Sequence, residues 1–173
     1  FQQKIAGLKF LDPACGSGSL LLKAAKVLGR DNVRNGFYGQ EINITTYNLC
    51  RINMFLHDIG YEKFDIACED TLTNPQHWDD EPFEVIVSNP PYVRESEKAF
   101  MRNNVLLYEP ALALFVSDKE PLIFYEHLLK FSNQNLAKNG KIYMEINENL
   151  AKETELLFKN FNYQTSVFKD LRG

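Results

Sequence analysis

Cysteine and histidine are scarce in this chain, with three of each among 173 residues. Cys15, Cys50 and Cys68 are odd in number and show no Cys-x-x-Cys spacing, which argues against a disulfide framework. The histidines lack the spacing of metal ligands, so no metal is expected. We therefore predict a cytoplasmic protein with reduced cysteines, in which Cys15 packs in the interior and is not a nucleophile.

Positive charge and long apolar runs are lacking as well. Lysine and arginine total 19 against 23 acidic residues, a net charge of −4, so no chain-wide basic field attracts nucleic acid. A partner subunit could still supply a basic surface for DNA. No apolar stretch approaches the roughly 18 residues of a membrane span, and no signal-peptide pattern is visible, so no membrane partner is expected.

Short apolar runs alternate with amphipathic stretches along the chain, and a hydrophobic content of 45% suits one globular domain. We expect strands at residues 8–12, 36–40, 63–68, 83–88, 141–146 and 165–169. We expect helices at residues 19–28, 44–57, 122–136 and 150–158. Strands separated by helices of this length predict an α/β fold with a Rossmann-like, doubly wound, mostly parallel sheet.

A polar residue stands at the end of each of the first four expected strands: Asp12, Glu41, Asp70 and Asn89. In a doubly wound sheet, ligands bind outside the carboxyl ends of the strands. We therefore predict that these four side chains belong to one binding site. Plainer alternatives stay open for two of them, because Glu41 could be a solvated strand end and Asp70 a helix cap or turn residue.

The loop after the first strand contains Gly16 and Gly18, which let the backbone turn tightly beside a ligand. It has neither a third glycine nor a P-loop lysine, so a phosphate site is not favoured. Glu41 stands where a doubly wound fold directs a carboxylate to a ribose diol, and Asp70 could accept a bond from an adenine amino group. These features together indicate an adenosine without phosphates that carries an amino-acid tail.

Residues 89–92, Asn-Pro-Pro-Tyr, follow the apolar fourth strand. The Asn89 carboxamide and the Pro90 carbonyl provide acceptors for two N–H groups, and the Tyr92 ring provides a stacking surface. Such a site suits a flat group with an exocyclic NH2, and the reaction it suggests is methylation of a planar amine or amide nitrogen. The plainer alternative is that the prolines only end the strand.

Four motifs resemble those of class I S-adenosylmethionine-dependent N-methyltransferases: residues 12–18 (DPACGSG), 38–43 (YGQEIN), 69–72 (EDTL) and 89–92 (NPPY). More closely, residues 1–92 resemble the adenine-methylating modification subunit of type I restriction systems. Residues 88–173 are similar instead to the release-factor glutamine methyltransferases, through residues 91–98, 104–110, 113–116, 121–125, 145–148 and 169–171. The two resemblances meet at the NPPY motif, which suggests a mosaic or chimera.

The resemblance implies a class I methyltransferase fold in a single domain over residues 1–173, with the last strand of the sheet missing. Residues 1–92 would form the cofactor-binding half, and residues 93–173 the acceptor-side half with a lid at about 93–119. The implied cofactor is S-adenosyl-L-methionine and the implied product is S-adenosyl-L-homocysteine.

The same resemblance implies residue roles. Asn89, Pro90 and Tyr92 would be catalytic. The cofactor would be held by Asp12, Pro13, Ala14, Gly16, Gly18, Glu41, Ile42, Asp70, Thr71 and Asn89. Asp12 and the glycine loop would hold the methionine moiety, Glu41 the ribose, Ile42 the adenine face and Asp70 the adenine amino group. In the lid, Arg94, Glu95 and Lys98 are either substrate contacts or part of a solvated surface.

Three functions stay open. In the first, which the lid segment favours, the acceptor is the side-chain amide of a glutamine in a peptide-chain release factor. In the second, the acceptor is adenine N6 of DNA, flipped from the duplex, and a specificity subunit is a partner. In the third, a chimeric protein binds the cofactor without catalysing transfer.

Overall fold

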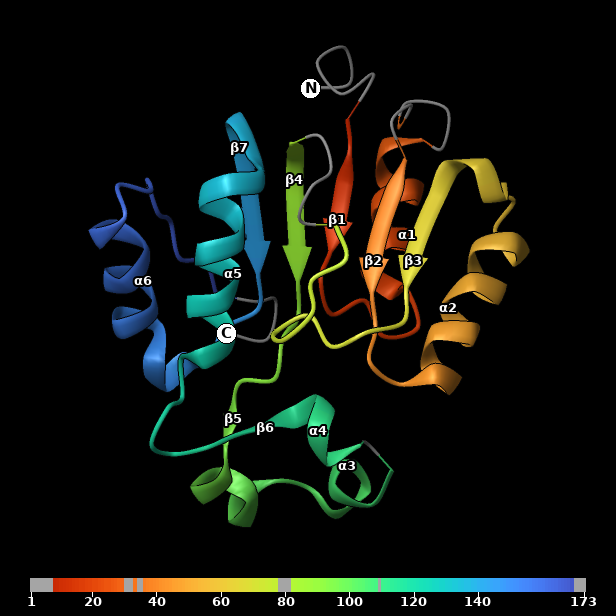
Figure 1. The fold of residues 1–173 in the computed structure, drawn as a ribbon. Helices are drawn as coiled ribbons and strands as arrows, with labels where there is room; N and C mark the ends of the chain where they lie inside the picture. Colours follow the sequence, from red (N-terminus) through yellow and green to blue (C-terminus); the bar gives the residue numbers. More distant parts are fainter. Residues whose placement is uncertain (1–7, 30–32, 34–35, 78–81, 109, 170–173) are drawn as a thin grey trace. The chain divides into compact units, whose positions relative to one another are not determined.

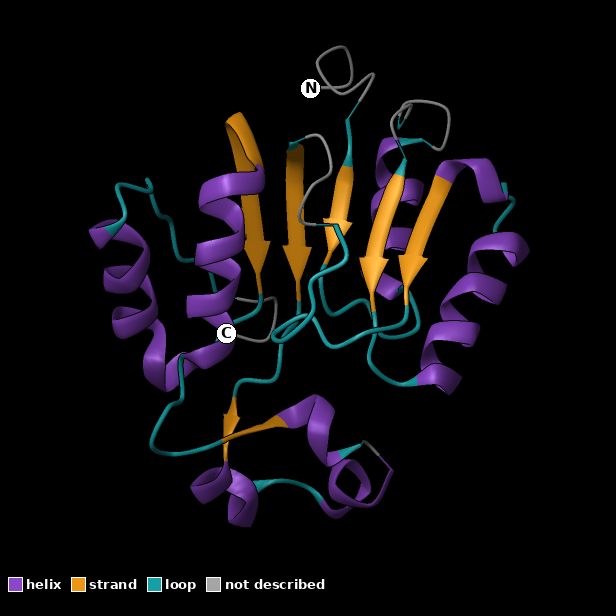
Figure 2. Cartoon of the chain, viewed as in Figure 1, coloured by secondary structure: helices purple, strands orange, loops and turns teal. Residues whose placement is uncertain are grey.

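A computed structural model describes residues 8–29, 33, 36–77, 82–108 and 110–169 of the chain (Figure 1). The chain forms two compact units, each with its own internal contacts. The first comprises residues 1–89 and 130–144, and the second comprises residues 90–129 and 145–173. Figure 2 shows that strands and helices alternate along most of the chain.

The first unit is built on a five-stranded sheet in the order β3-β2-β1-β4-β7. Its strands are β1 (Phe10–Asp12), β2 (Phe37–Gln40), β3 (Phe64–Ala67), β4 (Phe83–Ser88) and β7 (Leu136–Met144). Every pairing is parallel, and the arrows in Figure 1 accordingly point the same way. Because β1 has β2 on one side and β4 on the other, the strand order reverses at β1 and creates the switch point of a doubly wound sheet.

Two helices of the first unit follow β1 and β2. α1 (Ser19–Leu28) begins after Gly18, and Gly29 ends it with a backbone φ of 84°. α2 (Ile44–Leu56) begins at Asn43, whose side chain accepts the backbone N–H groups of Thr45 and Thr46, the usual arrangement of a helix N-cap. The 3-10 helix η3 (Tyr61–Lys63) leads into β3.

Apolar side chains from the strands and from both helices form the core of the first unit. Its buried members are Phe10, Cys15, Leu21, Ala25, Val33, Phe37, Cys50, Met54, Ile59 and Ile66. Two of the three cysteines are among them, and all three cysteines are free thiols. Burial of this apolar surface provides the main driving force for folding of the unit.

The second unit contains the segment that follows the NPPY motif and the C-terminal helix. Its elements are β5 (Val93–Arg94), η4 (Glu95–Phe100), α3 (Asn103–Tyr108), α4 (Ala111–Leu114), β6 (Phe115–Val116), η5 (Glu148–Leu150) and α6 (Ala151–Asn160). β5 and β6 pair as a parallel two-stranded sheet. α5 (Ile123–Asn135) is divided between the two units.

The expected strand at residues 165–169 is wrong, because this segment has no regular secondary structure. A strand needs a neighbour that satisfies its backbone groups, and among the described residues the main sheet ends at β7. Asn162 ends the preceding helix region with a backbone φ of 65°. The Thr165 hydroxyl then donates to Glu155 of α6 at 3.0 Å, so the segment is attached to a helix and not to a sheet.

In the part of the chain that the structure describes, no helix combines the length and apolarity needed to cross a membrane.

Candidate active site

The carboxyl edge of the parallel sheet carries the polar residues expected at the strand ends. Asp12 is the last residue of β1, Glu41 follows β2, and Asn89 follows β4. Asp70 lies three residues beyond the end of β3. Because the strands are parallel and adjacent, these residues lie along one edge of the first unit, where a doubly wound sheet binds its ligands.

The glycine loop between β1 and α1 adopts a backbone conformation that favours glycine at two positions. Gly16 has a φ of 53° and Gly18 a φ of 84°. A Cβ on Gly18 would lie 2.8 Å from Sγ of Cys50, whereas a Cβ on Gly16 would meet no atom within 4 Å. Gly18 is therefore required by packing within the protein, while the backbone at Gly16 borders open space that a ligand could fill.

Glu41 connects the glycine loop to the start of α2. Its Oε2 accepts the backbone N–H of Gly16 at 3.1 Å, and its Oε1 accepts that of Asn43 at 2.9 Å. Each carboxylate oxygen can accept a second hydrogen bond. The side chain is half-buried, so Glu41 can both hold the loop and offer acceptors to the hydroxyl groups of a ligand.

Asp12 is the most buried acidic residue of this edge, with 1% of its surface exposed. Its Oδ1 accepts the N–H of Ala14 at 3.1 Å. Burial raises the pKa of Asp12 to about 7, and the negative charge of Glu41 adds to the increase, although the bond from Ala14 opposes it. A buried carboxylate in this position would gain from a cationic ligand group, which would favour its ionised form.

The loop after β3 is attached to the glycine loop. The Thr71 hydroxyl donates to the carbonyl oxygen of Pro13, and Oδ1 of Asp70 accepts the N–H of Leu72 at 2.9 Å. Asp70 therefore acts as a turn residue, which is the plainer of its two interpretations. Its loop is also attached, through Thr71, to Pro13 of the glycine loop.

Two remaining candidates of the first unit are accessible to a ligand. Ile42 is 50% exposed, although it is a large apolar residue next to Glu41. Asn89 is exposed at the end of β4. Pro90 and Tyr92 belong to the second unit, where Pro90 is buried and Tyr92 half-buried.

Gln40 is a functional candidate that the sequence analysis missed. It is 2% exposed, and its Nε2 donates to the carbonyl oxygens of Glu69 at 3.1 Å and Asn74 at 3.0 Å. Its Oε1 accepts the N–H of Gln76 at 3.0 Å. The sequence does contain a feature that could have identified Gln40: it is a polar residue at the end of β2, whose other residues are mainly apolar or glycine. Gln40 holds the loop that carries Asp70 against β2.

In the second unit, the charged residues that follow the NPPY motif pair with one another. Arg94 forms a 2.8 Å ion pair with Glu97, and Lys98 forms a 2.5 Å ion pair with Glu95. The ammonium of Lys98 also lies over the ring of Phe115, 4.2 Å from its centroid. The exposed Glu95–Lys98 pair favours the solvated-surface interpretation of these two residues over direct substrate contact, whereas Arg94 is half-buried and pairs with Glu97.

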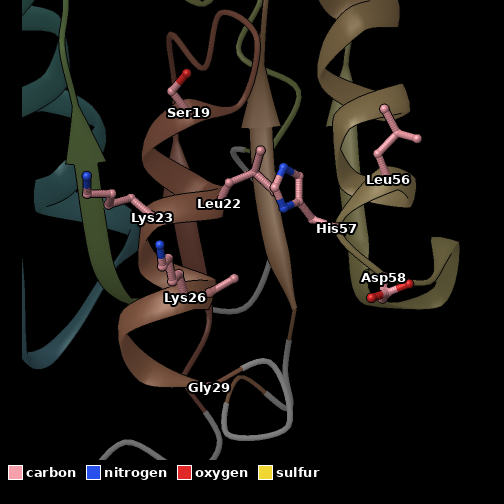
Figure 3. Close-up of a pocket in the computed structure, with 9 residues that line it drawn as sticks. Ser19, Leu22, Lys23, Lys26, Gly29, Leu56, His57 and Asp58 are labelled. Atoms are coloured by element: carbon pink, nitrogen blue, oxygen red, sulfur yellow. The ribbon is translucent and has the colours of Figure 1, made fainter.

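A separate cavity of about 530 Å³ lies between α1 and the C-terminal end of α2 (Figure 3). It is lined by Ser19, Leu22, Lys23, Ala25, Lys26, Gly29, Leu56, His57 and Asp58. None of the predicted site residues lines it. In Figure 3 the Lys23 side chain points away from His57.

The hydrogen-bond acceptors along the sheet edge suit an adenosine with an amino-acid tail better than a metal. Acidic acceptors at or after the ends of three strands stand beside an open glycine backbone, and these match a ligand rich in O–H and N–H donors. Among the described residues, no group of three or more histidine, cysteine, aspartate or glutamate side chains could hold a metal ion.

Comparisons with known proteins connect this geometry to a family. The sequence profile of the N-6 DNA methylases matches residues 3–154. A release factor glutamine methyltransferase from Flavobacterium psychrophilum is 36% identical over 173 aligned residues, which cover 98% of the chain and 56% of that protein. The methylase subunit of the type I restriction enzyme MpnII from Mycoplasma pneumoniae is 54% identical over 90 residues, which cover 47% of the chain and 16% of that subunit.

Solved structures agree with the sequence matches. The methyltransferase subunit of a type I restriction-modification system from Streptococcus thermophilus superposes with a TM-score of 0.57 at 30% identity, covering 80% of the chain and 29% of that subunit. Class I S-adenosylmethionine-dependent methyltransferases share the fold, which confirms the expected fold class. The chain spans about half the length of the glutamine methyltransferase that it matches.

Both resemblances noted in the sequence are confirmed by these matches, while a mosaic origin stays a hypothesis. The glutamine methyltransferase aligns on both sides of the NPPY motif, since it covers nearly the whole chain. Because the family profile spans residues 3–154 of 173, the chain belongs to the N-6 DNA methylase family of S-adenosylmethionine-dependent N-methyltransferases.

Proposed function

We propose that this protein transfers a methyl group from S-adenosyl-L-methionine to the side-chain amide of a glutamine in a peptide-chain release factor. The observation that carries the proposal is the sheet edge on which Glu41 holds the open Gly16 backbone, followed in sequence by the NPPY motif after β4. Support for glutamine as the acceptor comes from the relative that aligns with 98% of the chain, a release factor glutamine methyltransferase.

The first unit binds the cofactor in this proposal. Asp12 and the loop from Pro13 and Ala14 to Gly18 would hold the methionine moiety, and the Asp12 carboxylate would attract its ammonium group. Glu41 accepts bonds from the ribose hydroxyls through its remaining lone pairs. Ile42 packs against the adenine, and Asp70 and Thr71 border the adenine amino group. When bound, the cofactor supplies a methyl group that its sulfonium already activates, and its product is S-adenosyl-L-homocysteine.

Asn89 and Pro90 orient the acceptor nitrogen. An amide nitrogen is a poor nucleophile because its lone pair is delocalised into the carbonyl group. Oδ1 of Asn89 and the carbonyl oxygen of Pro90 accept hydrogen bonds from its two N–H groups, which raises electron density on nitrogen and aligns it for in-line attack. As the nitrogen gains the methyl group, one of its two protons is released to water. Each contact contributes roughly 2–4 kcal/mol to the transition state, by analogy with oxyanion-hole donors. Tyr92 stacks on the amide plane.

Adenine N6 in DNA is the second candidate acceptor. It is favoured by the family profile and by the 54% identity to the methylase subunit of a type I restriction enzyme. An adenine amino group presents the same two N–H donors on a flat ring, so the same motif could hold it after base flipping. With a net charge of −4, the chain would need a basic specificity subunit to bind DNA.

Methyl transfer to two acceptors tests the proposal. The protein is incubated with radiolabelled S-adenosyl-L-methionine and either a release factor containing a Gly-Gly-Gln sequence or unmethylated plasmid DNA. The control is the same release factor with the glutamine replaced by glutamate, which removes the NH2 acceptor. We expect label in the glutamine protein alone.

Label in DNA alone would overturn the choice of acceptor. Label in neither substrate, together with cofactor binding measured by calorimetry, would overturn the proposed activity and leave a chimeric protein that binds cofactor without catalysis.

A further inference from the structure

Glu97 of η4 is the centre of a hydrogen-bond network in the second unit. Its Oε1 accepts Nη2 of Arg94 at 2.8 Å and Nδ2 of Asn149 at 2.9 Å. Its Oε2 accepts the backbone N–H of Arg94 at 2.9 Å and Nδ2 of Asn147 at 2.7 Å. Four donors thus occupy the four acceptor positions of one carboxylate, and they come from segments about 50 residues apart in the chain.

The carboxylate is ionised under ordinary conditions. Only 18% of the Glu97 side chain is exposed, and the hydrogen bond from Arg94 is the main reason that its pKa falls to about 2. Hydrogen bonds to a charged, partly buried group are stronger than those between neutral groups. The network is therefore a firm connection, unlike the more exposed ion pair between Glu95 and Lys98 on the same segment.

Asn147 extends the network to the last residue of the NPPY motif. Asn147 is 6% exposed, and its Nδ2 donates both to Glu97 and, at 3.0 Å, to the carbonyl oxygen of Tyr92. Its Oδ1 accepts the N–H of Asn149 at 2.9 Å. Each of the two side-chain amide protons has one acceptor, so rotation of Asn147 would break both bonds.

The neighbouring pair Glu95–Lys98 is an ordinary surface ion pair on the same 3-10 helix. Its side chains are 50% and 41% exposed, and the pair joins residues of the same helix. Exposed pairs of this kind contribute little to stability. Glu95 therefore provides a matched control for Glu97, with the same charge, the same side chain and the same 3-10 helix.

We propose that Glu97 and Asn147 are positioning residues that fix the backbone at Tyr92 and Arg94, so that the end of the NPPY motif presents the acceptor group in one orientation. This inference rests on the proposed function, because it assigns the network a part in the same methyl transfer. A misplacement of about 1 Å in a positioned group can reduce turnover by roughly a hundred-fold. Neither residue contacts the acceptor itself in this proposal.

The test compares Glu97→Gln and Asn147→Ala with the control Glu95→Gln. Glu97→Gln keeps the size of the side chain but replaces one acceptor oxygen with an NH2 that faces two donors. We expect cofactor affinity to stay within about two-fold, because the cofactor residues lie in the first unit, while kcat for methyl transfer falls roughly ten- to a hundred-fold. The control variant keeps wild-type kcat and KM.

Amide hydrogen exchange gives a second readout that needs no acceptor substrate. The Arg94 N–H donates to Glu97, so its protection factor should fall in Glu97→Gln and Asn147→Ala but not in Glu95→Gln. If the wild-type protein methylates no acceptor, the proposed function fails, whereas the exchange data still decide whether the network holds the backbone.

Two outcomes would overturn the inference. One is equal exchange at Arg94 and equal kcat in Glu97→Gln and Glu95→Gln. The other is a parallel loss of cofactor affinity, stability and turnover in Glu97→Gln, which would indicate a general structural role.

Discussion

At the scale of single residues, Asp12 connects the chemistry of the sheet edge to stability. Its carboxyl is buried at the end of β1, and burial raises its pKa from 3.8 to about 7. The folded protein therefore binds this proton more tightly than the unfolded chain. The contribution of Asp12 to the free energy of unfolding is therefore fully present below about pH 4 and is lost as pH rises toward 7.

Asp12→Asn should remove that pH dependence. Asparagine keeps the Oδ1 acceptor for Ala14 and carries no charge, so the ligand-free variant should be more stable than wild type at pH 8, by about 1–4 kcal/mol. At pH 4 the difference should nearly vanish. Urea unfolding of both proteins at pH 4, 6 and 8 measures the difference in their free energies of unfolding. A difference that is constant across this range would contradict the raised pKa of Asp12. Cofactor affinity should fall in the same variant.

Asn89→Ala should separate binding from transfer. Asn89 is exposed at the end of β4, so its loss should change the free energy of unfolding by less than about 0.5 kcal/mol. Cofactor affinity should be retained, while kcat falls roughly a hundred- to a thousand-fold because one acceptor for the N–H groups is missing. Calorimetry and the methyl-transfer assay measure the two effects. Simultaneous loss of cofactor binding would exclude the proposed role.

At the scale of elements, the bounds of β4 and α1 are those expected from the sequence. β4 is an apolar run bracketed by Pro82 and Pro90, and α1 lies between Gly18 and Gly29. Proline and glycine act through the local backbone, so their effect can be predicted without knowledge of the fold. The bounds of β4 and α1 could therefore be predicted from the flanking prolines and glycines alone.

Elements that depend on distant partners were predicted less well. β7 was expected at residues 141–146, but it begins at Leu136, and its regular pairing with β4 resumes at Lys141 after a register shift. Residues 165–169 carry an apolar pattern but no strand, because β-pairing depends on a neighbouring strand that a local pattern cannot reveal. In the same way, Gln40 looks like an ordinary polar residue until the loop at Glu69 and Asn74 is seen to pack on it.

The attachment of the loop after β3 can be tested through Gln40. Gln40→Ala leaves the carbonyl oxygens of Glu69 and Asn74 and the N–H of Gln76 without their buried partner. We expect a loss of roughly 2–4 kcal/mol in the free energy of unfolding and weaker cofactor binding through Asp70. Gln76→Ala is the matched control, because Gln76 is exposed and its side-chain bond lies at the surface. Equal destabilisation by both variants would show that the buried bonds are unimportant.

At the scale of the whole molecule, the cofactor candidates before Pro90 all belong to the first unit, whereas the segment expected to form a lid and the Glu97 network belong to the second. The division differs from the expected halves at residue 92, since residues 130–144 return to the first unit to supply β7. In the proposed function, cofactor binding would depend on the first unit, whereas acceptor positioning would depend on Asn89 of the first unit and on residues of the second.

Hydrogen exchange with and without S-adenosyl-L-homocysteine tests this division. We expect the ligand to increase protection in the loops after β1, β2 and β3, where Gly16, Asn43 and Leu72 donate to site carboxylates. Protection of the amides in η4 should change little. Protection that rises equally in both units would mean that cofactor binding orders the whole chain.

From the position of β1 in the sheet we expect a particular order of events during folding. β1 pairs with β2 about 27 residues later, but its other neighbour is β4, where Phe10 aligns with Val85. Chain entropy opposes the closure of such a long loop, and parallel pairings between distant segments form slowly. The half of the sheet from β1 to β3 can assemble from nearby segments. We expect the pairing of β1 with β4 to form later, because it requires closure of the longer loop. That pairing brings Asn89 to the edge beside Asp12. We therefore expect a newly made chain to form the loops proposed to bind the nucleoside before Asn89 reaches its place in the proposed transfer site.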